Sequence, residues 1–401
     1  MTKKLYALMA IVMIAVLGLT ACGSAATPAA TAAPAAAATS APATSAPAQP
    51  AGKPIIAVCL PALDNPLMLA IQDTFVKGFG NNYDVQVVSA DGNANTQASQ
   101  VQNFSAMRVK LLVVMAVEAS SLVPNLIAAR QSGIQVLVIG GDPGNPDAYD
   151  SVMNTNQYLA GWFEAYMAKQ WVDKTYPDAA DGSIPTALLT SSLNPDAIAR
   201  SNGMKMISNP YMQDVNGNYI GLDGKQVTEA NKVPNPAYSS KVKIVTSTDA
   251  EMFQAGQTAM QNILTTNPDV VLILAYAGDG GMGASQAILD EYAKGSGISV
   301  IKDLNKVAIF GVGMIGAEGQ AVLDSATNKT VFRGTIRFGG DLVARTNDIV
   351  TKMLSGNVTK VIYDPLDIVT VIDGKLMSTP IDSSEYFTVP TAQPVPVVLM
   401  P

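Results

Sequence analysis

The sequence predicts an α/β protein with two lobes, each built on a parallel sheet covered by helices. The first observation is a repeating unit. The apolar, β-branched run Ile55–Leu60 is long enough for one buried strand and too short for a helix. The Asp-Asn-Pro segment 64–66 then favours a turn and a helix start. Apolar residues follow at three- and four-residue steps as far as Phe79, as expected for a helix with one face on that strand.

The second observation is that this unit recurs in two successive series. The expected strands are Val85–Val88, Leu111–Met115, Gln135–Ile139 and Val152–Met153 in the first series, and Thr186–Leu189, Val242–Val245, Val270–Ala275, Val307–Phe310, Val331–Ile336 and Ile368–Val371 in the second. The helices between them include one from Asn156, as its N-cap, to about Thr175. Another is introduced by a capping box at Thr248–Glu251. Two such series are typical of two parallel α/β lobes.

The N-terminus has the pattern of an export signal. Two lysines precede the apolar run Leu5–Leu17, and small residues follow it. The ending Leu-Thr-Ala-Cys resembles the lipobox of bacterial lipoproteins, which implies a signal peptide over 1–21 and a lipid on Cys22. An ordinary signal with a chance cysteine is the alternative. The segment 22–52 continues as a tether rich in Ala, Pro, Ser and Thr that cannot bury a core.

Composition narrows the classes of function. Beyond the tether about 350 residues remain, which is more than one core usually serves. The 25 basic and 32 acidic residues give a net charge of −7, which argues against a nucleic-acid partner. With Cys22 assigned to lipid, Cys59 has no disulfide partner and is expected to be a small buried hydrophobe. There is no histidine, the commonest general base and metal ligand, so no metal, cofactor or enzymatic activity is expected.

Four segments carry a resemblance to a known family. They are I-A-V-C-L-P-A-L-D-N-P at Ile56–Pro66, R-x-x-G-M at Arg200–Met204, N-P-D-V-V-L-I-L-A at Asn267–Ala275 and G-T-I-R-F-G-G-D at Gly334–Asp341. In this order, behind a lipobox, they resemble the sugar-binding lipoproteins of ABC importers, in the ribose-binding branch of the type I periplasmic binding proteins. The resemblance implies two Rossmann-like lobes joined by a three-crossing hinge, closing on a ligand.

The same resemblance divides the chain. Crossings near residues 155–156, 338 and 366–367 imply an N-terminal lobe of 53–155 and 339–366, and a C-terminal lobe of 156–338 and 367–401. The Pro-rich tail is expected to be irregular and to lie over the second lobe.

Residues 209–241 look like an insertion in the second lobe. Asp214, Asn216 and Asn218 have the spacing of an EF-hand-type calcium loop, but Tyr219 replaces the required glycine and Lys225 the bidentate glutamate. The Asn-Gly and Asp-Gly pairs in this segment favour turns of a β-hairpin. A hairpin is therefore the interpretation, and calcium the alternative.

A sugar presents hydroxyls around a ring with apolar faces, so its site needs planar hydrogen-bonding groups and apolar walls. Charged partners make the stronger bonds, and arginine offers a rigid fork of donors. The resemblance implies ligand contacts at Asn65, Asp142, Arg200 and Asp279, with Asp142 and Arg200 as the charged pair. The alternatives are a turn residue for Asn65, caps for the two aspartates and a surface cation for Arg200. Phe338 either stacks on the sugar or packs in the hinge.

The chain also departs from the family pattern. Leu67 and Met68 stand where the family usually has two aromatic residues, Gly313 where it has an aspartate, and Phe338 where it has a glutamine. The ligand therefore need not be ribose or a simple pentose.

Two glycine-rich motifs have other interpretations. Gly311–Gly316 fits G-x-G-x-x-G after a strand, but no acidic residue ends the next strand, as a dinucleotide site would require. Gly278–Gly283 lacks the Lys-Ser/Thr of a P-loop, and the helix that follows it is expected from Ala284 to Tyr292. Neither motif predicts nucleotide binding.

The sequence thus predicts an exported, lipid-anchored monomer on the cell membrane, facing the periplasm or the cell exterior. Its expected function is to capture a monosaccharide-like ligand between two lobes and deliver it to an ABC permease. The alternatives are a receptor for a nucleoside or autoinducer-type ligand, and a sensor module of a signalling system.

Overall fold

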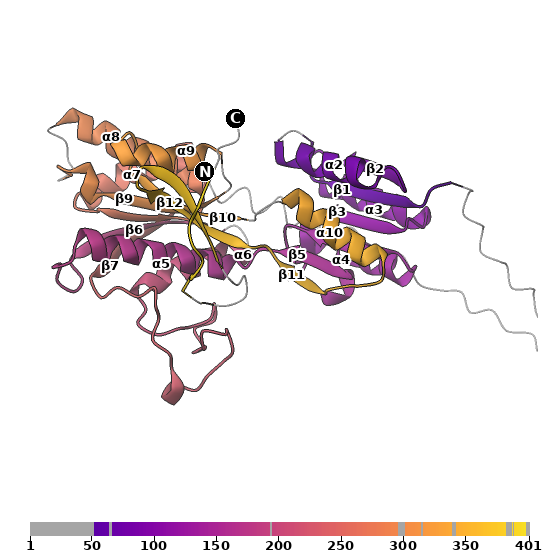
Figure 1. Cartoon of the computed structure of the whole chain (residues 1–401), viewed down its shortest axis with the longest axis horizontal. Coiled ribbons are helices and arrows are strands. Elements are labelled where there is room, and N and C mark those ends of the chain that lie inside the picture. The colour runs from indigo at the N-terminus through magenta and orange to yellow at the C-terminus, as the bar shows by residue number, and fades with distance from the viewer. Residues whose placement is uncertain are drawn as a thin grey trace, which may run out of the picture. The chain divides into compact units, whose positions relative to one another are not determined.

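The computed structural model describes residues 52–63, 66–192, 195–295, 301–313, 316–338, 342–381, 387 and 389–397. It contains two sheets, each flanked by helices (Figure 1). This confirms the prediction of a two-lobed α/β fold. Asn65 and Cys22 lie outside the described residues.

The first sheet is parallel throughout, in the order β11-β5-β4-β3-β1-β2. Its strands are β1 (Ile55–Leu60), β2 (Asp84–Ser89), β3 (Leu111–Met115), β4 (Gln135–Ile139), β5 (Ser151–Asn154) and β11 (Val361–Tyr363). Alternate residues of β1 face opposite sides, as the pleat of a strand requires. Ile56 packs with Phe75 of α2 (Pro66–Phe79) and Ile349 of α10 (Leu342–Leu354). Ala57 packs on the other side with α3 (Ala94–Ala106) and α4 (Ala119–Gln131).

Cys59 is fully buried in β1 and free. Burial raises the pKa of its thiol to about 12, so the group stays protonated and behaves as a small hydrophobe.

The second sheet has the order β14-β13-β12-β10-β9-β8-β6-β7. Its strands are β6 (Ile184–Thr190), β7 (Val242–Asp249), β8 (Leu272–Ala275), β9 (Ala308–Gly313), β10 (Phe332–Phe338), β12 (Leu366–Ile372), β13 (Lys375–Pro380) and β14 (Val395–Pro396). The strands from β7 to β10 are parallel, and β12 to β14 add antiparallel strands at one edge. The expectation of an irregular tail is therefore wrong for 375–380 and 395–396. These segments find backbone partners at an open sheet edge, which sequence periodicity alone does not reveal.

Helices cover both faces of the second sheet. One face carries α5 (Gln157–Thr175), with α6 (Pro195–Lys205) beside it, and the other carries α7 (Phe253–Thr266), α8 (Gly278–Lys294) and α9 (Ala317–Asp324). Short 3-10 turns complete the described elements: η1 (Pro146–Ala148), η2 (Met206–Ser208), η3 (Glu229–Asn231), η4 (Leu304–Lys306) and η5 (Ser325–Thr327).

The chain passes from one sheet to the other three times: between β5 and α5, between β10 and α10, and between β11 and β12. The first and third connections contact each other. The Thr155 hydroxyl donates to Asp364 at 3.2 Å, and the backbone N–H of Asp364 donates to the carbonyl of Asn154 at 2.7 Å. Arg345 of α10 forms an ion pair with Asp364 at 3.3 Å.

Local sequence signals correctly place several boundaries and misplace others. Asn156 caps α5, accepting from the N–H of Leu159 at 3.0 Å. The capping box at Thr248–Glu251 is wrong, because Thr248 and Asp249 extend β7 and pair with β6. Helix α7 instead begins after Met252, whose side chain makes no cap.

The insertion at 209–241 forms two antiparallel turns, with bridges between Gln213 and Tyr219 and between Ile220 and Gln226. Asp214 accepts the backbone N–H groups of Asn216 and Asn218 at 2.9 and 2.8 Å, as a turn residue does.

Buried side chains tie this insertion to α5. The Trp162 indole donates to Asn235 at 2.9 Å, and the Tyr158 hydroxyl donates to the carbonyl of Gln213 at 2.5 Å.

Candidate functional site

The carboxyl ends of the parallel strands bring predicted residues to the sheet edges. Asp142 follows β4 of the first sheet. In the second sheet, Asp279 lies in the first turn of α8, directly after β8, and Phe338 is the last residue of β10. Arg200 lies in α6, which follows β6. Ligands of open α/β sheets bind outside the carboxyl ends of the strands. The carboxyl ends of the strands in these two sheets are therefore the candidate site.

Arg200 is a buried cation with a fixed orientation; the residue is 6% exposed. Its Nε and Nη2 donate to Gln157 Oε1 at 2.9 and 2.5 Å, and its Nη1 donates to the carbonyl of Tyr276 at 2.7 Å. These bonds use three of the five N–H donors of the guanidinium fork. Burial lowers the pKa of Arg200, and the nearby Tyr276 and Glu164 oppose that shift. The surface-cation alternative is therefore wrong.

Two aromatic rings flank this guanidinium. The Arg200 Cζ lies 4.2 Å from the ring centroid of Tyr276 and 5.0 Å from that of Phe338. Both distances are within the range of cation–π contacts. Phe338 thus packs on Arg200 and on the core of the second sheet. Tyr276 was not predicted from the sequence, although it follows the apolar run of β8 at the carboxyl edge.

The R-x-x-G pattern has a packing reason. A Cβ on Gly161 of α5 would lie 2.1 Å from the carbonyl oxygen of Arg200, and one on Gly203 would lie 2.2 Å from that of Tyr158. Real Cβ atoms do not approach backbone this closely, so α5 and α6 meet through two glycines. That contact brings Arg200 within reach of Gln157.

Asp142 lies in an exposed turn after β4. One carboxylate oxygen accepts the backbone N–H of Gly144 at 2.8 Å, and the other accepts the Tyr149 hydroxyl at 3.0 Å. Burial, followed by this bond to Asp142, raises the pKa of Tyr149 to about 12. Asp142 therefore acts within the turn, and its role toward a ligand stays a prediction.

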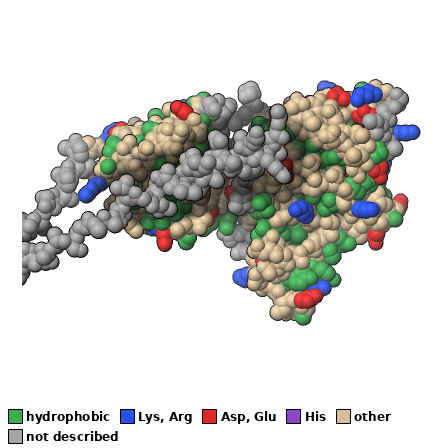
Figure 2. Space-filling model, turned by 180° about the vertical axis from the view of Figure 1, so that it is seen from behind, with side chains coloured by type: hydrophobic (Ala, Val, Ile, Leu, Met, Phe, Trp, Pro, Cys, Tyr) green, Lys and Arg blue, Asp and Glu red, His purple; other side chains and the backbone are tan. Residues whose placement is uncertain are grey.

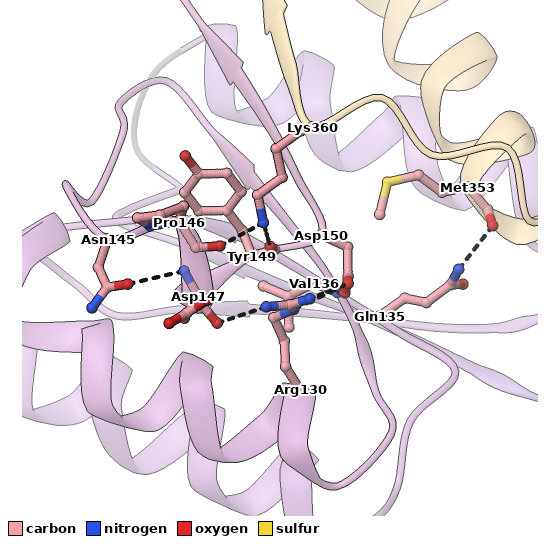
Figure 3. Close-up of polar contacts among 10 residues, drawn as sticks. All are labelled: Arg130, Gln135, Val136, Asn145, Pro146, Asp147, Tyr149, Asp150, Met353 and Lys360. Carbon is pink, nitrogen blue, oxygen red and sulfur yellow. Dashed lines mark hydrogen bonds and ion pairs between the residues drawn. The ribbon is translucent and has the colours of Figure 1, made fainter.

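A polar network holds the loop that carries Asp142 (Figure 3). Arg130 donates from Nε and Nη2 to Asp150 at 3.0 and 2.8 Å, and from Nη1 to the carbonyl of Asp147. Lys360, which precedes β11, donates to the carbonyls of Pro146 and Tyr149. The loop is thus anchored from α4 and from the last segment of the first sheet.

Further carboxylates, which were not predicted from the sequence, also lie near the carboxyl ends of the strands. Burial raises the pKa of Asp196 in α6; Arg200 opposes this rise, and the negative charge of Asp142 adds to it. Asp249, at the end of β7, accepts the hydroxyls of Thr190 and Ser192, and these bonds hold its pKa low. An aspartate at a binding site cannot be told from an aspartate in a turn by sequence alone. Only the fold shows which of these carboxylates lie at the carboxyl ends of the strands.

Glu318 reaches across the ends of two neighbouring strands. A Cβ on Gly313, at the end of β9, would lie 2.8 Å from Glu318 Oε1, and one on Gly278 would lie 2.4 Å from its Cγ. Burial raises the pKa of Glu318, and the charge of Asp279 adds to the rise. Gly313 therefore makes room for this side chain.

The glycine-rich run Gly278–Gly283 belongs to α8 rather than to a loop. A Cβ on Gly283 would lie 1.9 Å from the carbonyl oxygen of Phe253, and Gly256 approaches Gly280 as closely. The run therefore allows α7 and α8 to pack backbone to backbone. The expectation that a helix begins only at residue 284 is wrong, because this contact outweighs the low helix propensity of glycine.

One buried arginine with aromatic neighbours, together with carboxylates and hydroxyls, suits a neutral molecule rich in hydroxyl groups. Within the residues that the structure describes, no three His, Cys, Asp or Glu side chains are grouped to hold a metal ion. Basic and acidic side chains are interspersed on the face seen in Figure 2.

The fold and its polar strand edges define the class of two-lobed α/β binding proteins. The chain belongs to the periplasmic binding protein family: the model of the periplasmic binding protein domain matches residues 56–357. Membership implies an extracytoplasmic location. In the described part of the chain, no helix has both the length and the hydropathy needed to span a bilayer.

Solved structures share the fold at low identity. A solute-binding protein of an ABC transporter from Bacillus halodurans C-125, with bound myo-inositol, is 17% identical, with a TM-score of 0.57, covering 80% of this chain and 95% of that one. A periplasmic ribose ABC transporter protein from Conexibacter woesei DSM 14684 is 16% identical, with a TM-score of 0.59, covering 80% and 92%.

Among curated proteins, the chain is similar to a xylitol-binding protein of Mycolicibacterium smegmatis. The two are 34% identical over 80 residues, which is 20% of this chain and 22% of that protein.

Proposed function

We propose that the protein is a solute-binding lipoprotein that captures a monosaccharide-like ligand and delivers it to an ABC permease, anchored through a lipid on Cys22. The observation that carries this proposal is Arg200, a buried fork fixed between Tyr276 and Phe338 at the carboxyl edge of the second sheet. A fork with free N–H groups donates to ring hydroxyls, and carboxylates such as Asp142 accept from them.

The relatives support the ligand class. Their descriptions include myo-inositol, ribose and xylitol, and a further structure of this fold, from Actinobacillus succinogenes 130z, has bound D-allose (17% identical, TM-score 0.55, covering 79% of this chain and 98% of that one). All are uncharged polyols or sugars. The acidic groups at the strand edges favour such ligands over sugar phosphates or sugar acids, which would be repelled.

A thermal-shift screen of the tether-free protein tests the proposal. We expect at least one of xylitol, myo-inositol, D-ribose and D-allose to raise the unfolding temperature, because a ligand at 100 times its Kd stabilises the folded state by about 2.7 kcal/mol. Calorimetry then gives the Kd. Stabilisation by nucleosides alone would contradict the sugar assignment and favour a nucleoside receptor.

A further inference from the structure

Glu164 of α5 is a buried acid that the proposed ligand contacts leave unexplained. Its side chain is 0% exposed. Its Oε1 accepts the backbone N–H of Ala275 at 2.8 Å, whereas its Oε2 has no hydrogen-bond partner among the described residues. A buried carboxyl group with one unsatisfied oxygen lowers stability, and an apolar side chain would avoid that cost. Its presence therefore calls for a role other than packing.

The position of Glu164 on α5 indicates what that role is. Gln157, Gly161 and Glu164 are spaced by four and three residues, so they share one face of the helix. Gln157 holds the guanidinium of Arg200, and Gly161 admits the backbone of Arg200. Glu164 holds Ala275, the last residue of β8. One face of α5 thus contacts both Arg200 and the end of β8.

The bond from Ala275 to Glu164 helps to fix the end of β8, directly before Tyr276. The carbonyl of Tyr276 accepts from Arg200 Nη1, and its ring lies beside the same guanidinium. A shift of the end of β8 would therefore move both a hydrogen-bond acceptor and an aromatic wall. Burial raises the pKa of Glu164 well above its ordinary range, while the Ala275 bond and the charge of Arg200 oppose the rise.

We propose that Glu164 is a positioning residue for ligand binding. By holding the last residue of β8, it sets where Arg200 and Tyr276 meet the ligand. The proposal rests on the proposed function of Arg200 as a ligand contact. Glu164 itself is buried behind that contact.

Three substitutions at Glu164 separate positioning from packing. E164Q keeps an acceptor for Ala275, E164L removes it, and E164D withdraws it by one methylene. The Kd is measured by calorimetry for whichever of xylitol, myo-inositol, D-ribose and D-allose binds the wild type most tightly. We expect E164L and E164D to weaken binding about tenfold or more, and E164Q to stay within about threefold of the wild type.

Ser285→Ala is the matched control. The buried hydroxyl of Ser285 likewise accepts a backbone N–H, that of Val331, at 3.0 Å, but at the start of β10 rather than at the ligand edge. We expect it to lower the unfolding temperature and leave the Kd unchanged. Near-UV circular dichroism verifies the fold of each variant, and E164D decides the matter if E164L does not fold.

The outcomes are distinct. If the wild type binds none of the four probes, the proposed function fails and this inference fails with it. If the wild type binds but E164L or E164D binds within about threefold of it, the inference alone is overturned. Equal losses of affinity in E164D and Ser285→Ala would also overturn it, because a general loss of stability would then explain both.

Discussion

At the scale of single residues, Arg200 and Arg333 provide a comparison of the same side chain in two roles. Arg200 is buried and Arg333 is half-buried, and each donates to carbonyl oxygens, but Arg333 bonds the carbonyls of Val307, Leu304 and Ser325 away from the carboxyl edge. Lysine keeps the charge and loses the planar fork. We expect Arg200→Lys to weaken sugar binding by about 2–4 kcal/mol, or about 30- to 1000-fold.

Arg333→Lys serves as its control and should lower the urea midpoint while leaving the Kd within about threefold of the wild type. Calorimetry and urea unfolding of both variants check this. Similar affinities in wild type and Arg200→Lys would remove Arg200 from the binding site.

Asp142 is tested by Asp142→Asn, which keeps an oxygen for the N–H of Gly144 and removes the charge. Hydrogen bonds to charged groups contribute about 1.5–3 kcal/mol, so affinity should fall about 10- to 150-fold with little change in stability. Asp147→Asn in the same loop is the control, because Asp147 contributes backbone groups to the network of Figure 3. Unchanged affinity in Asp142→Asn would leave Asp142 as a turn residue only.

Glu164 also predicts how stability depends on pH. Its pKa is raised in the folded protein, so the folded state keeps a proton that the unfolded chain loses above about pH 4.3. The stability from this group is full below that pH and falls as pH rises toward the folded pKa, by up to about 1.4 kcal/mol per pH unit. Glu164→Gln cannot ionise, so its advantage in unfolding free energy over the wild type should grow between pH 5 and 8.

Urea unfolding at several pH values measures this difference, with exposed Glu229→Gln as the control. A difference between Glu164→Gln and wild type that is constant across this range would contradict the prediction.

At the scale of elements, the contact between α5 and α6 depends on the absence of two Cβ atoms. Gly161→Ala and Gly203→Ala would each place a methyl group against backbone, which cannot move as a side-chain end does. We expect each to reduce the free energy of unfolding by about 1–3 kcal/mol, and Gly161→Ala also to weaken ligand binding because it displaces Arg200. If the free energy of unfolding of both variants, measured in urea, is within about 0.5 kcal/mol of the wild type, the close contact between α5 and α6 does not contribute to stability.

Sequence patterns sufficed where one segment determines its own structure. β1, β3 and β4 have the predicted bounds, because each is a short apolar run ended by turn-forming residues. Predictions were wrong where contacts with a distant segment set the secondary structure. Thr248 and Asp249, predicted to cap a helix, pair with β6 as part of a strand, and the glycine run 278–283 is helical where it packs against α7.

The candidate site divides in the same way. Arg200 and Phe338 were named from the sequence and lie together, since each ends or follows a strand of one sheet. Tyr276, Gln157 and Glu164 were not, because their roles depend on three segments meeting around one guanidinium. The spacing of residues in the sequence does not show that these three segments come into contact.

At the scale of the whole molecule, the proposed lipidation of Cys22 is the feature to test. Cys22→Ser removes the thiol that the lipobox-like ending offers for lipidation. We expect the variant to leave the membrane fraction while its ligand affinity stays unchanged, because about 30 residues of the sequence lie between residue 22 and the first strand. Cell fractionation checks the location, and Cys59→Ser, which alters a buried thiol, is the control. Unaltered membrane retention of Cys22→Ser would contradict lipidation at this residue.

The first sheet is completed by β11, which pairs with β5, and its helix α2 is covered by α10. Both late elements follow β5 in the sequence by roughly 200 residues, with most of the second sheet between them. As the chain is made from its N-terminus, the lobe that begins first is therefore finished after most of the other. A nascent chain that stops short of residue 361 exposes β5 as an edge strand, open to pairing with another chain. Synthesis from the N-terminus thus leaves the first lobe incomplete until the five strands β6 to β10 of the second lobe have been made.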